Sequence, residues 1–483
     1  MKAFGVSALM VPGLLLAALN FSNPVMCSDQ TSEWWSAGNG CIGANSELYE
    51  AWNHTGLGSG DGGIYFAASY DTNQTWSSDI TVHYWDPTWI HAEYKSPKLA
   101  ATGDTVYCIY WVRPEHASLT YYLYCSRSDD HGATWNIFDI SITGSPGTTR
   151  GHNFAIGPDR AVNLVFATAP SIFVKSKPYF CRSTNGGVTF STPILLPCDT
   201  TNVIATNPSI AVADDGTIFV VASYSRIQDG LDLYLAVSHD NGATFDTTNL
   251  TPVLGSGYYP ILRVGTNNRL YLCYETEDDQ IKFTFSTDQG VTWQTPFQIV
   301  GDNFGWTFAA RDDRLLAVWN DGSSWRLYQR NSADAGATWS EPGRVWPTAP
   351  FPSDWLQLSG DIRNDLAIIS MHPEPGNVEA QYCSHAKWLS GITGPKSAPL
   401  RTRASLTAAP NPFSRFTLLQ APETCTQPLT VSIFTTTGRF IRKLELNRTA
   451  VWDGTDANGN RLPAGVYLCK AGNLAPARLV FGN

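Results

Sequence analysis

The chain has 483 residues, with 32 basic and 42 acidic side chains and a formal charge of −10 at neutral pH. No basic stripe is present that would neutralise phosphates, and this excludes a nucleic-acid partner. Charged residues make up only 15%, below the roughly 25% that is usual for soluble domains, whereas Gly, Thr, Asn and the 17 Trp are plentiful. This composition indicates an all-β exported protein.

The N-terminus has the layout of a secretory signal peptide. Lys2 precedes an apolar run from Val6 to Leu19, and small residues follow shortly afterwards. We predict that residues 1–27 are the signal, that cleavage occurs after Cys27, and that the mature chain is secreted or held at the cell surface. No later stretch is long and apolar enough to span a membrane.

The ten Cys fit an oxidising compartment, although their spacing does not fix their pairing. Buried free thiols that act as small apolar residues are an equal alternative. The pairs expected on neighbouring strands, or locally in the last domain, are Cys108 with Cys125, Cys181 with Cys198, and Cys425 with Cys469.

An eight-residue turn of the pattern S-x-D-x-G-x-T-W recurs six times and is clearest at Ser128 to Trp135. In such a turn the Asp or Asn side chain folds onto nearby backbone amides, and the Gly takes a positive φ. Asn73 replaces the Gly in the first copy, and Asn tolerates the left-handed region well. The residues at the Asp position, to which we assign a structural role, are Asp71, Asp130, Asn185, Asp240, Asp288 and Asp334.

These turns resemble the Asp boxes, or BNR repeats, of the sialidase superfamily of β-propellers. In that family the box joins the third and fourth strands of a blade, on the side away from the active site. The resemblance therefore implies a propeller whose boxes are scaffold, and it directs the search for a site to the opposite face.

The spacing of the boxes fits one four-stranded sheet per repeat. One repeat predicts strands at 259–264, 270–275, 281–286 and 297–300 from their apolar patterns. Seven units begin near Gly38, Pro97, His152, Asn207, Tyr259, Trp306 and Trp355. We predict an all-β propeller over 31–390, with seven blades favoured and six, the family norm, as the alternative.

The seventh unit has no Asp box and shows only three strands. A segment near Ser32 to Ser36 is expected to close the ring by pairing there.

A linker rich in Gly, Pro, Ser and Ala is predicted at 391–404, and a small sandwich at 405–483. The order of PNPF (410–413), WDG (452–454), NG (458–459) and AGVY (464–467) resembles the immunoglobulin-like domain shared with the flagellar hook-capping protein. That domain serves as a C-terminal sorting domain for type IX secretion, so the resemblance implies the type IX machinery as a partner. A plain binding or spacer module is the alternative.

The catalytic set of the sialidases is not recognisable. That family holds the substrate carboxylate with three Arg, the first of which lies in an F/Y-R-I-P motif before the first blade. Here no Arg precedes Arg113, so no catalytic residue is assigned.

Polar and aromatic residues are nevertheless expected where first strands begin, opposite the Asp boxes. Aromatic rings there stack on sugars, and two carboxylates such as Glu93 and Glu115 match the acid and base of a glycosidase. For each residue the alternative is a solvated loop or core position. The ligand-binding candidates are His91, Glu93, Arg113, Glu115, Arg150, His152, Tyr258, Tyr259, Arg263, Trp306, Arg311 and Trp355.

We therefore expect an exported, sialidase-like propeller that binds an extracellular glycan or glycoconjugate at its central face. The alternatives are an exo-sialidase-like glycoside hydrolase and a surface scaffold for protein partners. The scattered His residues predict no metal site, and no motif predicts a cofactor.

Overall fold

The computed structural model describes residues 18–29, 38–54, 62–84, 93–113, 122–140, 148–169, 176–197, 203–226, 231–300, 303–321, 326–346, 356–373, 380–388, 406–409, 411, 413–421, 429–435, 440–471 and 477–482. Contacts divide the chain into two units, Met1–Ile392 and Thr393–Asn483. The two short helices of the described part are α1 (Thr251–Leu254) and η1 (Thr266–Asn268). Within those ranges, no helix has the length and hydropathy of a membrane span.

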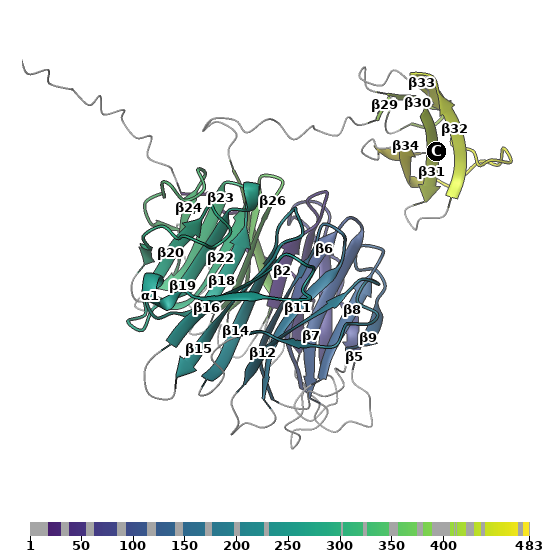
Figure 1. Ribbon diagram of the computed structural model, residues 1–483. Coiled ribbons are helices and arrows are strands. Elements are labelled where there is room, and N and C mark those ends of the chain that lie inside the picture. Colours follow the sequence, from purple (N-terminus) through teal and green to yellow (C-terminus); the bar gives the residue numbers. More distant parts are fainter. Residues whose placement is uncertain are drawn as a thin grey trace, which may run out of the picture. The chain divides into compact units, whose positions relative to one another are not determined.

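The first unit is a β-propeller, as predicted (Figure 1). Its described residues form seven four-stranded antiparallel sheets, and the innermost strand of each contacts the innermost strands of both adjacent sheets, so the ring is closed.

Six of the sheets use four strands consecutive in sequence. Innermost first, these are β2 (Gly38–Ile42), β3 (Leu48–His54), β4 (Gly63–Ser69), β5 (Ile80–Tyr84); β6 (Glu93–Thr102), β7 (Thr105–Arg113), β8 (Tyr122–Ser128), β9 (Asn136–Asp139); β10 (Thr148–Ile156), β11 (Val162–Ala169), β12 (Lys177–Ser183), β13 (Ile194–Leu195); β14 (Val203–Val212), β15 (Ile218–Arg226), β16 (Leu231–Ser238), β17 (Asp246–Asn249); β18 (Tyr258–Val264), β19 (Leu270–Glu275), β20 (Ile281–Ser286), β21 (Phe297–Val300); and β22 (Asn303–Arg311), β23 (Arg314–Asp321), β24 (Arg326–Ser332), β25 (Gly343–Arg344).

Both faces of each sheet are covered by the neighbouring blades, which explains the continuous apolar runs in the second strands. In β7, Cys108 and Tyr110 belong to one core cluster, whereas Tyr107, Ile109 and Trp111 belong to another. The same alternation separates Cys108 from Cys125. These residues lie on paired strands, but Cys125 is opposite Ile109, so the two thiols face different clusters and do not meet.

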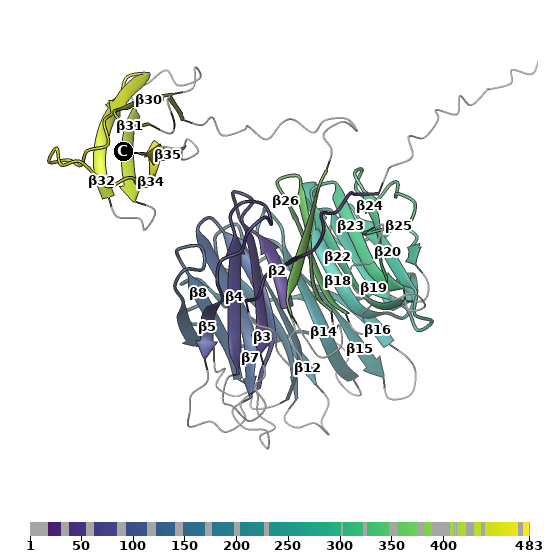
Figure 2. The ribbon, with the colours of Figure 1, turned by 180° about the vertical axis from the view of Figure 1, so that it is seen from behind.

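The seventh sheet is completed by the N-terminal segment. Its inner strands are β26 (Leu356–Arg363), β27 (Leu366–Pro373) and β28 (Tyr382–Lys387), and its outer strand is β1 (Val25–Met26), which pairs with β28. Figure 2 shows the dark purple N-terminal segment running across this part of the ring. The segment 32–36, which was predicted to close the ring, lies outside the described residues, and the strand found at this edge comes from upstream of it.

The Asp boxes are turns held by their own side chains. In the fourth sheet, the Gly242 N–H donates to Ser238 Oγ at 2.8 Å, and Ser238 Oγ donates to Asp240 Oδ1 at 2.8 Å. The backbone N–H of Thr244 donates to Asp240 Oδ1 at 2.9 Å. The Thr244 hydroxyl donates to Asp240 Oδ2 at 2.6 Å, and this bond, with those from the Thr244 N–H and the Ser238 hydroxyl, favours the ionised carboxylate and lowers the pKa of Asp240 to about 2. Gly242 has φ 84°, which few other residues adopt.

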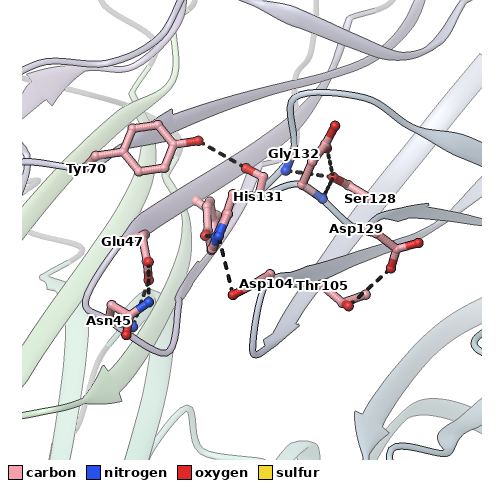
Figure 3. Close-up of polar contacts among 11 residues, drawn as sticks. Asn45, Glu47, Tyr70, Asp104, Thr105, Ser128, Asp129, His131 and Gly132 are labelled. Atoms are coloured by element: carbon pink, nitrogen blue, oxygen red, sulfur yellow. Dashed lines mark hydrogen bonds and ion pairs between the residues drawn. The ribbon is translucent and has the colours of Figure 1, made fainter. Parts of the chain in front are cut away.

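Each box also packs against the preceding blade. An added Cβ at Gly132 would lie 2.1 Å from the ring of Phe66, and Trp135 meets that ring edge-on at 5.1 Å. The same turn places His131 Nδ1 2.9 Å from Tyr49 Oη, while Tyr70 Oη donates to the His131 carbonyl at 3.3 Å (Figure 3). The boxes therefore join neighbouring blades.

The second unit is a small β-sandwich of two sheets. The smaller sheet contains β29 (Thr407–Ala409), β30 (Thr417–Gln420) and β33 (Thr449–Trp452); the larger contains β31 (Leu429–Thr435), β32 (Phe440–Leu446), β34 (Gly465–Ala471) and β35 (Ala477–Phe481).

The motifs of this unit are structural. Trp452 is fully buried and donates from Nε1 to the Thr455 carbonyl at 3.0 Å. An added Cβ at Gly454 would meet the Phe481 ring at 2.6 Å. The hydroxyl of Tyr467 donates to the Pro463 carbonyl at 2.7 Å. WDG and AGVY therefore organise the core and corners of the sandwich.

Candidate functional site: a bulge-lined cavity

Five consecutive inner strands, β6, β10, β14, β18 and β22, interrupt their pairing at the same level with a β-bulge. The inserted residues with positive φ are Ser96 (53°), Gly151 (114°), Asn207 (46°), Tyr259 (45°) and Gly305 (155°). The remaining inner strands, β2 and β26, pair without a break. Bulges redirect side chains and occur beside active sites, so this repeated irregularity marks one sector of the central face.

All five of these residues line one cavity of about 550 Å³. This volume falls within the range of small-molecule sites. The full lining is Ser96, Lys98, Gly151, His152, Asn153, Asn207, Pro208, Tyr259, Pro260, Ile261, Glu275, Gly305 and Trp306. The Asp-box turns contact the opposite ends of the blades: the N–H of Ala335 donates to Asp313 in the β22–β23 turn. The cavity and the boxes therefore lie at opposite ends of the sheets.

Aromatic side chains form part of the wall. Tyr259 is 55% exposed. Its positive φ is uncommon for a residue with a bulky side chain. Trp306 is half-buried and donates from Nε1 to Glu275 Oε2 at 3.0 Å. Glu275 ends β19, and burial raises the pKa of its carboxyl. Trp306 thus fixes the orientation of the one carboxylate among the described lining residues.

His152 is a neutral acceptor in the wall. Its Nε2 lies 3.0 Å from the Ile109 carbonyl, which only accepts, so Nε2 carries the proton. Burial lowers the pKa of His152 to about 3, and the ring is therefore uncharged near neutral pH. Its Nδ1 has no hydrogen-bond partner among the described residues.

Lys98 is the one lysine or arginine of the described lining, and it has no counter-ion among the side chains that the structure describes. Its side chain is half-buried, and burial together with the charge of Arg263 lowers the pKa of its ammonium. Among the described side chains, none forms an ion pair or hydrogen bond with Lys98. Arg263 lies on β18, two blades beyond the blade next to Lys98, and donates from Nη1 to the Leu262 carbonyl at 2.9 Å. An unpaired cation that is partly removed from water creates a preference for an anionic group in the cavity.

Of the candidates predicted from the sequence, His152, Tyr259 and Trp306 line the cavity. Tyr258 begins β18 opposite Glu275 and is half-buried beside it. Arg263 lies further along the same strand.

Arg311 was expected at this face but lies at the other end of β22. It is exposed and pairs with Arg314 across the turn to β23. The prediction was misplaced because a first strand runs away from the central face, so its last residue reaches the Asp-box end.

The other candidates are less fully described. Arg113 ends β7 opposite Glu93 and is half-buried. Glu93 and Arg150 belong to β6 and β10, of which the structure describes the backbone at these positions. His91, Glu115 and Trp355 lie outside the described residues.

Sequence reasoning missed Lys98 and Glu275. The signal that locates Lys98 is a Pro near the start of several predicted inner strands, in the pairs Ser96-Pro97, Asn207-Pro208 and Tyr259-Pro260. Such pairs mark a backbone irregularity, and Lys98 directly follows the first of them. No comparable signal surrounds Glu275.

No protein-family model and no curated protein matches the chain. Solved structures similar to it include a protein of unknown function from Dyadobacter fermentans DSM 18053, with 14% identity over 77% of this chain and 100% of that one and a TM-score of 0.49. Another is the Hadza microbial sialidase Hz136, with 14% identity over 72% of this chain and 74% of that one and a TM-score of 0.47. A third is an α-L-arabinanase of Penicillium chrysogenum complexed with arabinobiose, with 12% identity over 66% of this chain and 99% of that one and a TM-score of 0.47. Sequence identities of 12–14% with TM-scores of 0.47–0.49 do not establish the activity of this chain.

Proposed function

We propose that the protein binds a saccharide that carries an anionic group, in the cavity lined by the five bulges. The observation that carries this proposal is the ammonium of Lys98, half-buried and unpaired among the described residues, in a cavity that also presents Tyr259 and Trp306. Aromatic rings cover the apolar faces of sugars, while a few fixed polar groups set orientation. Glu275, Asn153 and Asn207 supply such groups for sugar hydroxyls.

We expect Lys98→Met to lower the affinity for an acidic oligosaccharide about 10- to 100-fold, because a charge-assisted bond is worth about 1.5–3 kcal/mol. The measurement is calorimetric titration with uronate or sulfated oligosaccharides found on a glycan array, and with neutral oligosaccharides of the same linkage. Lys98→Arg should retain part of the affinity, and Lys387→Met, an exposed lysine of β28, should retain all of it. Equal binding of acidic and neutral sugars by the wild type would overturn the anionic preference, and no glycan binding at all would overturn the whole proposal.

Glycoside hydrolysis is the second candidate, and one observation favours it. The raised pKa of Glu275 suits a general acid. A hydrolase of the usual kind needs two carboxylates, however, and Glu275 is the single one among the described residues of the lining. We therefore expect a panel of 4-methylumbelliferyl glycosides, sialoside included, to show no turnover above background. Turnover abolished by Glu275→Gln would instead establish an enzyme.

We also propose that the chain is exported and that the sandwich acts as its sorting signal for type IX secretion. The apolar run from Val6 to Leu19 and the PNPF-to-AGVY tail support this proposal. Deletion of 405–483 should leave a folded propeller in the periplasm of a host with this system, detected by fractionation and immunoblotting. Surface delivery of the truncated chain at the wild-type level would show that the tail is a plain spacer.

A further inference from the structure

The N-terminal segment fastens the propeller ring. Leu19 and Phe21 are buried in the core shared by the last two sheets, and Gln329 Nε2 donates to the Leu19 carbonyl at 2.6 Å. The Ser22 N–H donates to the His385 carbonyl at 2.7 Å, and Trp346 Nε1 donates to the Ser22 carbonyl at 2.7 Å. Residues 19–22 therefore belong to the folded domain.

The segment then reaches the first sheet. Val25 lies opposite Cys383 in the β1–β28 pair, and the Cys27 N–H continues the ladder by donating to the Gln381 carbonyl at 2.8 Å. The Asp29 N–H donates to Asp79 Oδ1 at 2.8 Å, beside the outer strand of the first sheet. A cut after Cys27 would remove β1 and open the edge of the last sheet.

Two thiols meet where this closing strand pairs. Cys27 is opposite Gln381, so it is the diagonal neighbour of Cys383 on the same face of the sheet. Both side chains are buried in one cluster, at 2% and 0% exposure. Both are free thiols in the structure: Cys27 Sγ donates to the Val25 carbonyl at 3.5 Å, and Cys383 Sγ donates to the Ser384 carbonyl at 3.9 Å.

Diagonal neighbours have Cα atoms about 7–8 Å apart, slightly beyond the range of about 4.4–6.8 Å that is usual for disulfides. A bond between the two sulfurs therefore requires β1 to move towards β28, and β1 is an edge strand of two residues with a partner on one side alone.

We propose that Cys27 and Cys383 form a disulfide that fastens the N-terminal strand to the last sheet, and that the mature chain retains this strand together with Leu19 and Phe21, which are buried in the propeller. The two thiols lose two protons and two electrons, and the electrons pass to an external disulfide, such as an oxidising protein disulfide or oxidised glutathione, which is reduced to two thiols. The cross-link closes a loop that includes nearly the whole propeller, a position at which a disulfide restricts the unfolded chain strongly.

Peptide mapping of the wild-type chain tests the bond. The protein is refolded with oxidised glutathione, and free thiols are alkylated under denaturing, non-reducing conditions. The Cys27 and Cys383 peptides should be recovered as one cross-linked species that separates on reduction. Recovery of both as alkylated single peptides would overturn the disulfide, and an exported protein whose N-terminus is Ser28 would overturn retention of the strand.

Thermal unfolding gives a second measurement. Reductant should lower the Tm of the wild type but not that of Cys383→Ala. Cys273→Ala is the matched control, since Cys273 is also fully buried, in a different core cluster. Its Tm should still fall on reduction. An equal response of the wild type and Cys383→Ala to reductant would contradict the proposal.

Discussion

Glu50→Gln is expected to stabilise the propeller at neutral and alkaline pH and to remove a large part of its pH dependence. Glu50 is fully buried in β3, where it accepts hydrogen bonds from Ser370 Oγ and, at 3.2 Å, from Gln381 Nε2. Burial outweighs these bonds and raises the pKa of its carboxyl to about 8. The glutamate is therefore protonated in the fold near neutral pH and ionised in the unfolded chain.

The sign follows from proton linkage. The native state holds the proton between the unfolded pKa, about 4.3 for Glu, and about 8, so stability is greatest below this window and falls as the pH rises through it. At about 1.4 kcal/mol per pKa unit, the loss at pH 7 is about 4 kcal/mol. An amide of the same shape carries no charge to bury, so the variant avoids this loss.

Denaturant unfolding between pH 4 and pH 8 measures the effect. The wild type should lose stability across this range by more than Glu50→Gln does. Glu341→Gln, at an exposed position, is the control and should follow the wild type. Parallel profiles for the wild type and Glu50→Gln would show that the carboxyl is already ionised in the fold.

Glu50 was not foreseen from the sequence, and the reason is physical. Within the Leu48–His54 strand it occupies an ordinary alternating position, and only the return of residues 370 and 381–383 to the first sheet surrounds it with partners. Ring closure joins residues more than 300 positions apart, which no local pattern encodes. The closing strand was sought at 32–36 for the same reason: its two residues, Val25 and Met26, are too few to form a pattern.

The local elements, in contrast, were well predicted. Strands expected at 270–275, 281–286 and 297–300 have those bounds as β19, β20 and β21, because apolar periodicity and Asp-box turns specify them locally. The starts expected for inner strands fell near Pro97, His152 and Asn207, whereas β6, β10 and β14 each begin four residues earlier. The Pro and Gly signals that were interpreted as strand starts belong to the bulges inside these strands.

The bulges inside these strands bring the side chains of the cavity together, so strand starts placed four residues too late also left part of the lining unrecognised. Tyr259, Trp306 and His152 were recognised as polar or aromatic residues at strand starts. Lys98 was missed because a lysine within a predicted strand is ordinarily a solvated residue, and Glu275 because it ends a second strand with no motif around it. Their common environment depends on five blades meeting around one axis.

Tyr259→Asn is expected to weaken ligand binding at least 10-fold while leaving the fold as stable as the wild type or slightly more stable. At φ 45°, Tyr259 is the one aromatic residue among the five bulge positions, whereas Asn207 occupies the equivalent place in β14. A left-handed conformation costs most side chains about 1–2 kcal/mol, and Asn tolerates it better. The ring is 55% exposed, so its removal costs little buried apolar contact. The strained backbone conformation therefore serves a purpose other than stability.

Calorimetric titration and thermal unfolding of the same samples separate the two effects. Tyr259→Phe should keep the ring and so most of the affinity, and Tyr84→Ala, at a tyrosine that is 50% exposed on the outer strand β5, should change neither property. An exposed ring that is kept at a backbone cost, and that lines the same cavity as a lysine unpaired among the described residues, is what a stacking surface for an anionic sugar requires. If Tyr259→Asn lowered the Tm and left the affinity unchanged, the tyrosine would be a packing residue and the binding surface would have to be sought elsewhere on the propeller.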